Sequence, residues 1–132
     1  MKYFTIAELC RSNTADRLGI NNKCNQEHVS NLTALVDNVL DPLREAYGKP
    51  ITVNSGYRCP TLNKAVKGAA SSQHMTGQAA DIDTGDRQQN KLLFEYIRKN
   101  LPFDQLIDES NFAWVHVSFR ADGNNRSQVL KL

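Results

Sequence analysis

The chain has 132 residues, of which 40% are hydrophobic and 23% are charged, a composition typical of one folded globular domain over residues 1–132. The 16 Lys and Arg residues against 14 Asp and Glu residues give a formal charge of +2, and no basic run stands out. This balance argues against a nucleic-acid-binding protein, and the short apolar runs argue against a membrane span.

The N-terminal segment does not have the pattern of a secretory signal peptide, because Glu8 interrupts the apolar residues of MKYFTIAELC. We therefore expect synthesis in the cytoplasm without a Sec export signal. Thr5 and Glu8 have the spacing of a capping box, so a short helix is predicted to follow Thr5. A second short helix is predicted between Asn13-Thr14, which can cap it, and Gly19.

The longest predicted helix begins after Asn25 and ends before Gly48, which is followed by Pro50. Pro42 lies inside this segment and should kink the helix or start a new turn. Apolar residues recur through the segment at helical spacing: Val29, Leu32, Val36, Val39, Leu43 and Tyr47.

Beyond Pro50 the pattern changes to short strands. A short helix is predicted after Pro60, a small-residue loop over residues 67–77, and a longer helix after Asp86. Strands are predicted at Ile51–Val53, Ala79–Asp83, Gln105–Asp108 and Trp114–Phe119, with a short one near Val129. A helical first half packed on a small, mainly antiparallel sheet is an α+β fold.

The three cysteines do not form a recognisable framework. Cys10, Cys24 and Cys59 are odd in number and widely spaced, and no pair has the C-x-x-C spacing of a zinc knuckle. We expect three reduced thiols. A bridge between Cys10 and Cys24 is an alternative on which the spacing does not decide.

Two histidines and an aspartate are candidate metal ligands. His74 lies in the glycine-containing loop, Asp81 follows seven residues later on a predicted strand, and Gly77 allows the reversal between them. His116 lies in the middle of the last long predicted strand. Two imidazoles and one carboxylate are typical of catalytic zinc, which leaves one coordination position open for water. The structural alternative for each histidine is a hydrogen-bonded core residue, and a domain without metal is then possible.

The pattern His-x-x-Gly-x-Ala-x-Asp at 74–81, followed by Trp-x-His at 114–116, resembles the signature of the zinc D,D-peptidase family. That family includes D-alanyl-D-alanine carboxypeptidases and dipeptidases, phage endolysins that cut peptidoglycan stem peptides, and the zinc-bearing domain of hedgehog proteins. Residues 55–63 and 103–107 also resemble family blocks, and residues 4–15 resemble the short bacterial and phage form.

The resemblance implies one zinc ion bound by His74, Asp81 and His116. It also implies that Arg58 projects into the cleft and holds the substrate carbonyl or the developing oxyanion. The alternative for Arg58 is a structural ion pair.

Four further residues are expected near the substrate. Ser72 and Gln73 bind substrate or only shape the ligand loop, and Tyr57 and Trp114 form cleft walls or belong to the core.

The sequence departs from the family pattern at the general base. Many members carry Glu or Asp three residues before the last ligand, or His two before it, whereas this chain has Ala113 and Trp114 there. Neither side chain can transfer a proton. Glu109-Ser110 resembles the Glu-Ser pair of the hedgehog domain, so we expect Glu109 to be the base. Its alternative is an exposed glutamate of a hairpin turn.

The resemblance implies a zinc metallopeptidase that hydrolyses peptide bonds at D-amino acids in peptidoglycan stem peptides, as a D,D-carboxypeptidase or an endolysin-type endopeptidase. A zinc-binding module without turnover, which would bind the cell wall or a protein, is the alternative. We expect a monomer whose partner is the stem peptide. Phage-type release is one route from the cytoplasm to the wall.

Overall fold

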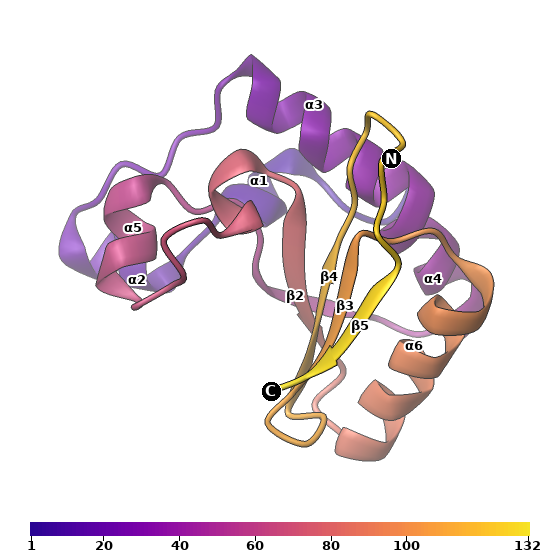
Figure 1. The fold of residues 1–132 in the computed structure, drawn as a ribbon. Coiled ribbons are helices and arrows are strands. Elements are labelled where there is room, and N and C mark those ends of the chain that lie inside the picture. The colour runs from indigo at the N-terminus through magenta and orange to yellow at the C-terminus, as the bar shows by residue number, and fades with distance from the viewer.

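The computed structural model describes residues 1–132 and has the expected α+β architecture (Figure 1). The helical elements are α1 (Ile6–Cys10), α2 (Asn13–Leu18), α3 (Gln26–Leu35), the π-helical turn η1 (Val36–Leu40), α4 (Asp41–Tyr47), α5 (Pro60–Ala65), the 3-10 turn η2 (Gln73–Thr76) and α6 (Arg87–Asn100). The strands are β1 (Thr52–Ser55), β2 (Ala79–Asp83), β3 (Gln105–Glu109), β4 (Trp114–Ser118) and β5 (Gln128–Lys131).

Local capping chemistry explains where several helices begin. The side chains of Thr5, Asn25 and Asp86 accept hydrogen bonds from backbone N–H groups in the first turns of α1, α3 and α6, as the sequence predicts. The cap of α2 differs from the prediction. It is Ser12, whose Oγ accepts from the Ala15 N–H at 3.1 Å, because the helix begins one residue earlier than expected.

Pro42 lies in the first turn of α4 and starts a new helical segment, which confirms one of the two expected outcomes. Proline has no N–H to donate, and its ring crowds the carbonyl group of the preceding turn. The chain widens into the π turn η1 before it and continues as α4 after it. The helical path therefore runs from Gln26 to Tyr47 with one irregular turn.

The sheet has the strand order β1-β2-β4-β3-β5, and every neighbouring pair is antiparallel except β3 and β5. The register pairs Asp81 of β2 with His116 of β4, and His116 with Ile107 of β3. Residues directly opposite each other share a face of the sheet. One face therefore carries a row of Asp81, His116 and Ile107 across three strands.

The opposite face of the sheet packs into the hydrophobic core. Alternate residues of the same strands, among them Ile82 and Val115, are fully buried there. The helix α6 packs on β3 and β4, and α4 packs on α6. Helical residues of this core are Leu9, Leu32, Leu35, Val36, Val39, Leu40, Leu43, Leu93, Phe94 and Ile97. The hydrophobic core therefore covers one face of the sheet, and Asp81 and His116 lie on the other face.

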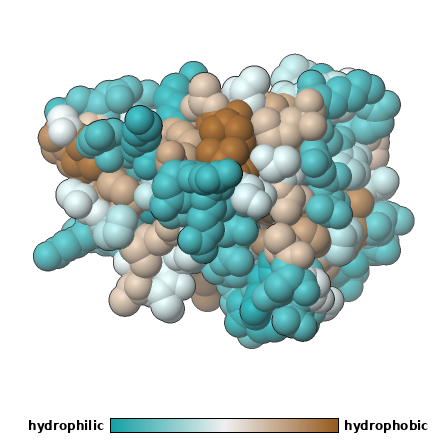
Figure 2. Space-filling model, turned by 90° about the horizontal axis from the view of Figure 1, so that it is seen from above, coloured by the Kyte–Doolittle hydropathy of each residue, from teal (hydrophilic) through white to brown (hydrophobic).

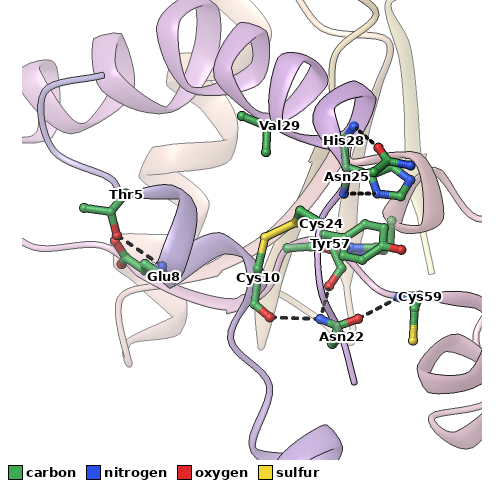
Figure 3. The surroundings of a disulfide bond; sticks show 12 residues. Thr5, Glu8, Cys10, Asn22, Cys24, Asn25, His28, Val29, Tyr57 and Cys59 are labelled. Atoms are coloured by element: carbon green, nitrogen blue, oxygen red, sulfur yellow. Dashed lines mark hydrogen bonds between the residues drawn. A yellow bond between two sulfur atoms is a disulfide. The ribbon is translucent and has the colours of Figure 1, made fainter. Parts of the chain in front are cut away.

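Cys10 and Cys24 form a disulfide bond, so the expectation of three reduced thiols is wrong for these two residues (Figure 3). Only Cys59 is free. The fold brings the end of α1 against the segment before α3, and the Asn22 side chain donates to the Cys10 carbonyl oxygen at 2.9 Å. The spacing of the cysteines in the sequence does not predict that these two segments meet.

No helix has both the length and the apolar character required to cross a lipid bilayer. Seen from above, hydrophilic residues cover much of the surface, and the apolar residues are scattered among them (Figure 2).

Candidate metal centre

His74, Asp81 and His116 converge, although they come from η2, β2 and β4. One ligand atom of each side chain lies within 4.8 Å of the other two. Oδ1 of Asp81 is 3.3 Å from Nε2 of His74 and 2.9 Å from Nδ1 of His116. The three candidates named from the sequence therefore form one cluster that could hold a metal ion.

The fold brings His74 over the sheet through a short turn. The Ser72 hydroxyl accepts from the His74 N–H at 3.2 Å and caps η2 at its start. Gly77 ends η2 with a φ of 78°, in the left-handed region that glycine adopts readily, and the chain then enters β2. The expected reversal at Gly77 is thus present.

The Gly56 carbonyl group orients the His74 ring. Nδ1 of His74 lies 2.7 Å from the Gly56 oxygen. A carbonyl can only accept, so Nδ1 carries the proton and Nε2 carries a lone pair. That Nε2 is buried and makes no hydrogen bond, although Asp81 is close to it. A buried acceptor without a donor, aimed at a carboxylate and a second imidazole, fits a metal ligand whose other ring nitrogen is held by the protein.

Asp81 is held in its ionised form. Burial raises the pKa of this carboxyl group, but the hydrogen bond from His116 and attraction to both rings outweigh burial and hold the pKa well below its usual range. An ionised carboxylate beside two imidazole nitrogens is the donor set of a divalent transition metal such as zinc. The residues present therefore fit such an ion.

A cavity of about 620 Å³ opens at this cluster, and most of the predicted site residues line it. Its walls include the three candidate ligands together with Arg58, Ser72, Gln73, Glu109 and Trp114. The structure does not place Tyr57 in this wall. The Tyr57 side chain is buried in the core, where its ring stacks on His28 with centroids 4.2 Å apart, so the core alternative named for it holds and the expected contact with substrate does not.

Arg58 lies in the cavity wall without an anionic partner. Its side chain forms no ion pair, and its Nε is buried without a hydrogen bond, so the structural alternative named for it is not what the fold contains. Burial lowers the pKa of Arg58, and the charge of Asp81 partly offsets this. An unpaired guanidinium at the edge of the cluster is available to a ligand.

Glu109 also lines the cavity, half-buried at the end of β3. Burial raises its pKa, as does the charge of Asp81, whereas the two histidines act in the opposite direction. The carboxyl group forms no ion pair. Because it is partly buried and lines the same cavity as the three candidate ligands, it is not the exposed turn residue of the alternative interpretation.

The Gln73 side chain already has a hydrogen-bond partner in the protein, so its amide group is not free to bind substrate. Its Nε2 donates to Oδ2 of Asp104 at 2.9 Å, and its Oε1 is buried without a partner. Asp104 is fully buried and also accepts from Nε and Nη2 of Arg126 at 3.0 and 2.8 Å. The hydrogen bond from Arg126 is the main reason that the pKa of Asp104 falls to about 2.

Several cavity residues were missed from the sequence. Gln105 and Ile107 line the cavity because they alternate with Glu109 along one face of β3, and this spacing of two could have identified them. Arg126 carried no comparable signal, since its place depends on the buried Asp104.

Comparisons with known proteins agree with this arrangement. A family model described as Peptidase M15 matches residues 2–118. A curated relative, the zinc D-Ala-D-Ala carboxypeptidase of Streptomyces albus G, is 42% identical over 76 residues. The match covers 50% of this chain and 30% of the relative, so the chain spans less than a third of that protein's length.

Proposed function

The chain belongs to the peptidase M15 family, and on this premise we propose that it is a zinc metallopeptidase that hydrolyses peptide bonds at D-amino acids in peptidoglycan stem peptides. One observation carries the proposal. The unpartnered Nε2 of His74 faces Asp81 and His116 in a cavity that also contains Arg58 and Glu109.

His74, Asp81 and His116 would hold one zinc ion, which is the metal named in the description of the Streptomyces albus G relative. When bound, zinc supplies a Lewis acid that polarises the scissile carbonyl and lowers the pKa of water. The backbone carbonyl of Gly56 keeps the ring of His74 in the tautomer that such binding requires.

Glu109 would move the proton. Its raised pKa brings the carboxyl group closer to neutral pH, which suits a group that takes a proton from water and later gives it to the leaving amine. A glutamate in this role must reach the reacting atoms, and its place in the cavity wall allows this.

Arg58 would orient the substrate carbonyl and stabilise the negative charge that develops on its oxygen. Its guanidinium meets no protein carboxylate, so the substrate oxygen does not have to displace an existing partner. Trp114 would form an apolar wall beside the substrate, and Ser72 and Gln73 would shape the turn that carries His74.

The description of the relative supports D-Ala-D-Ala as the dipeptide to be cut. The cavity is also lined by Lys67 in addition to Arg58, and these cations suit a peptide that carries carboxylates. A carboxypeptidase would release terminal D-alanine, and an endolysin-type endopeptidase would release longer stem fragments.

The disulfide between Cys10 and Cys24 supports action outside a reducing cytosol, because such bonds persist mainly in oxidising compartments. We propose that the protein acts at the cell wall, which it would reach after synthesis in the cytoplasm by phage-type release.

A zinc-binding module without turnover is the second candidate. It is favoured by Ala113 and Trp114, which occupy the positions where many family members carry a proton-transferring group. This module would bind the cell wall or a protein, and it would not cleave a stem peptide.

The test uses purified protein, purified sacculi and a synthetic pentapeptide ending in D-Ala-D-Ala. We expect about one zinc ion per chain by elemental analysis, release of D-alanine or stem fragments, loss of release with EDTA, and recovery with zinc. Bound zinc with no new amine from either substrate would favour the binding module. Absence of bound zinc after incubation with the metal would contradict both candidates.

A further inference from the structure

The carboxamide of Asn22 binds the backbone on both sides of Arg58 (Figure 3). Its Nδ2 donates to the carbonyl oxygen of Tyr57 at 3.0 Å, and its Oδ1 accepts from the N–H of Cys59 at 2.7 Å. The same Nδ2 also donates to the carbonyl of Cys10 at 2.9 Å. One side chain therefore spans the single residue whose guanidinium lines the cavity.

The backbone around Arg58 is also held from its other sides. The N–H of Arg58 donates to the carbonyl of His74 at 2.9 Å, and the N–H of Tyr57 donates to the carbonyl of Leu9 at 2.8 Å. These bonds join the segment to η2 and to α1. The position of the Arg58 backbone thus depends on three neighbouring segments, and the Asn22 side chain is the contact that binds both residues next to Arg58.

Asn22 itself lies outside regular secondary structure, in the segment of residues 20–25 between α2 and α3. The disulfide of Cys24 with Cys10 attaches this segment to the end of α1. The Asn22 carboxamide contacts the Cys10 carbonyl, so the covalent link and the hydrogen bond act on the same two segments.

We propose that Asn22, anchored by the Cys10–Cys24 disulfide, is a positioning residue that sets the place of the Arg58 guanidinium in the cavity. The inference rests on the proposed function, in which Arg58 holds the substrate carbonyl. A shift of about 1 Å in such a group can cost about a hundredfold in rate. Asn22 does not touch the substrate and acts through Arg58.

The first test is a double-mutant cycle on the zinc-loaded protein, with D-alanine release from the pentapeptide as the readout. We expect Asn22→Ala to lower kcat roughly tenfold or more while zinc content is retained. In an Arg58→Ala background, Asn22→Ala should cause no further loss, because the group that it positions is gone. An equal loss in both backgrounds would overturn the proposal.

Asn125→Ala is the matched control. The Asn125 carboxamide also binds both backbone groups of one residue, since it accepts from the Arg120 N–H at 2.8 Å and donates to the Arg120 carbonyl at 3.1 Å. It does not contact Arg58. We expect this variant to retain wild-type kcat. If Asn22→Ala does not fold, the near-isosteric Asn22→Asp replaces it. This variant keeps the oxygen that accepts from the Cys59 N–H, loses the two donated hydrogen bonds and places a carboxylate oxygen against the carbonyls of Cys10 and Tyr57.

The second test does not need activity, so it separates this proposal from the proposed function. We expect the NMR resonance of the Arg58 side-chain Nε–H to shift in Asn22→Ala and in the Cys10→Ser/Cys24→Ser variant, and to stay in place in Asn125→Ala. An unchanged Arg58 resonance in Asn22→Ala would overturn the positioning role. An unchanged resonance in the cysteine variant alone would overturn the anchoring role of the disulfide. If the Arg58 resonance shifts in Asn22→Ala but the wild-type protein hydrolyses no peptide, the positioning role is supported and the proposed function is contradicted.

Discussion

Glu109 lies directly opposite Trp114 in the antiparallel ladder of β3 and β4. Opposite residues share a face, and Trp114 is two residues before His116 on that same face. The carboxyl group that positions 113 and 114 lack is therefore present on the adjacent strand. A neighbouring strand can supply a group that is missing from the strand of the ligand itself.

Replacement of Glu109 by Gln should nearly abolish hydrolysis. We expect kcat to fall by roughly 10²- to 10⁴-fold, the usual contribution of a general acid–base group, because the amide cannot take a proton from water. Zinc content, measured by elemental analysis, should stay the same. Glu95→Gln is the control, since Glu95 pairs with Arg98 on the surface of α6. Full activity in Glu109→Gln would remove Glu109 from the mechanism.

Replacement of Arg58 by Lys should keep a positive charge but lose the planar set of donors. We expect kcat/KM to fall, though by less than the roughly 10²- to 10³-fold loss typical when one oxyanion donor is removed completely. Steady-state kinetics on the pentapeptide measures this. The exposed Arg98→Lys should have no effect, and a wild-type kcat/KM in Arg58→Lys would be inconsistent with a directional hydrogen bond.

Replacement of Gly56 by Ala should disturb the metal centre through the Gly56 carbonyl group, which binds the His74 ring. A Cβ on Gly56 would overlap the backbone carbonyl of Leu9, so the loop that holds the His74 ring must move. We expect a loss of about 1–3 kcal/mol in the free energy of unfolding, the usual cost of overpacking, together with weaker zinc binding. Thermal unfolding and zinc titration measure the two effects. Asn54→Ala, at an exposed position of the adjacent strand β1, is the control, and unchanged zinc affinity in Gly56→Ala would contradict this reasoning.

Replacement of Asp104 by Asn should change how stability depends on pH. Folding lowers the pKa of Asp104 from 3.8 to about 2, so its stabilising effect is full above pH 3.8 and is lost as the pH falls toward 2. We expect Asp104→Asn to have a lower Tm than the wild type at pH 7, and the difference to narrow between pH 4 and 2. Circular dichroism melts follow this, with Asp16→Asn as the control, since Asp16 is exposed on α2 and forms no ion pair. A constant difference across that pH range would show that Asp104 does not act through its charge.

The sequence by itself predicted most of the elements, and its resemblance to a known family predicted the candidate ligand set. Capping residues such as Thr5, Asn25 and Asp86 act on backbone groups within one turn, so their effect is visible in the local order of residues. The resemblance to zinc D,D-peptidases, seen in the spacing around His74 and before His116, is confirmed by the family match over residues 2–118.

Only the tertiary structure decided which segments meet. The disulfide of Cys10 with Cys24, the burial of Tyr57 against His28, and the support of Arg58 by Asn22 each join residues that no local pattern relates. Such contacts depend on packing between elements far apart in the chain, where the hydrophobic effect is not directional. Local chemistry therefore specified the parts, and the register of the sheet and the packing of the helices specified the cavity between them.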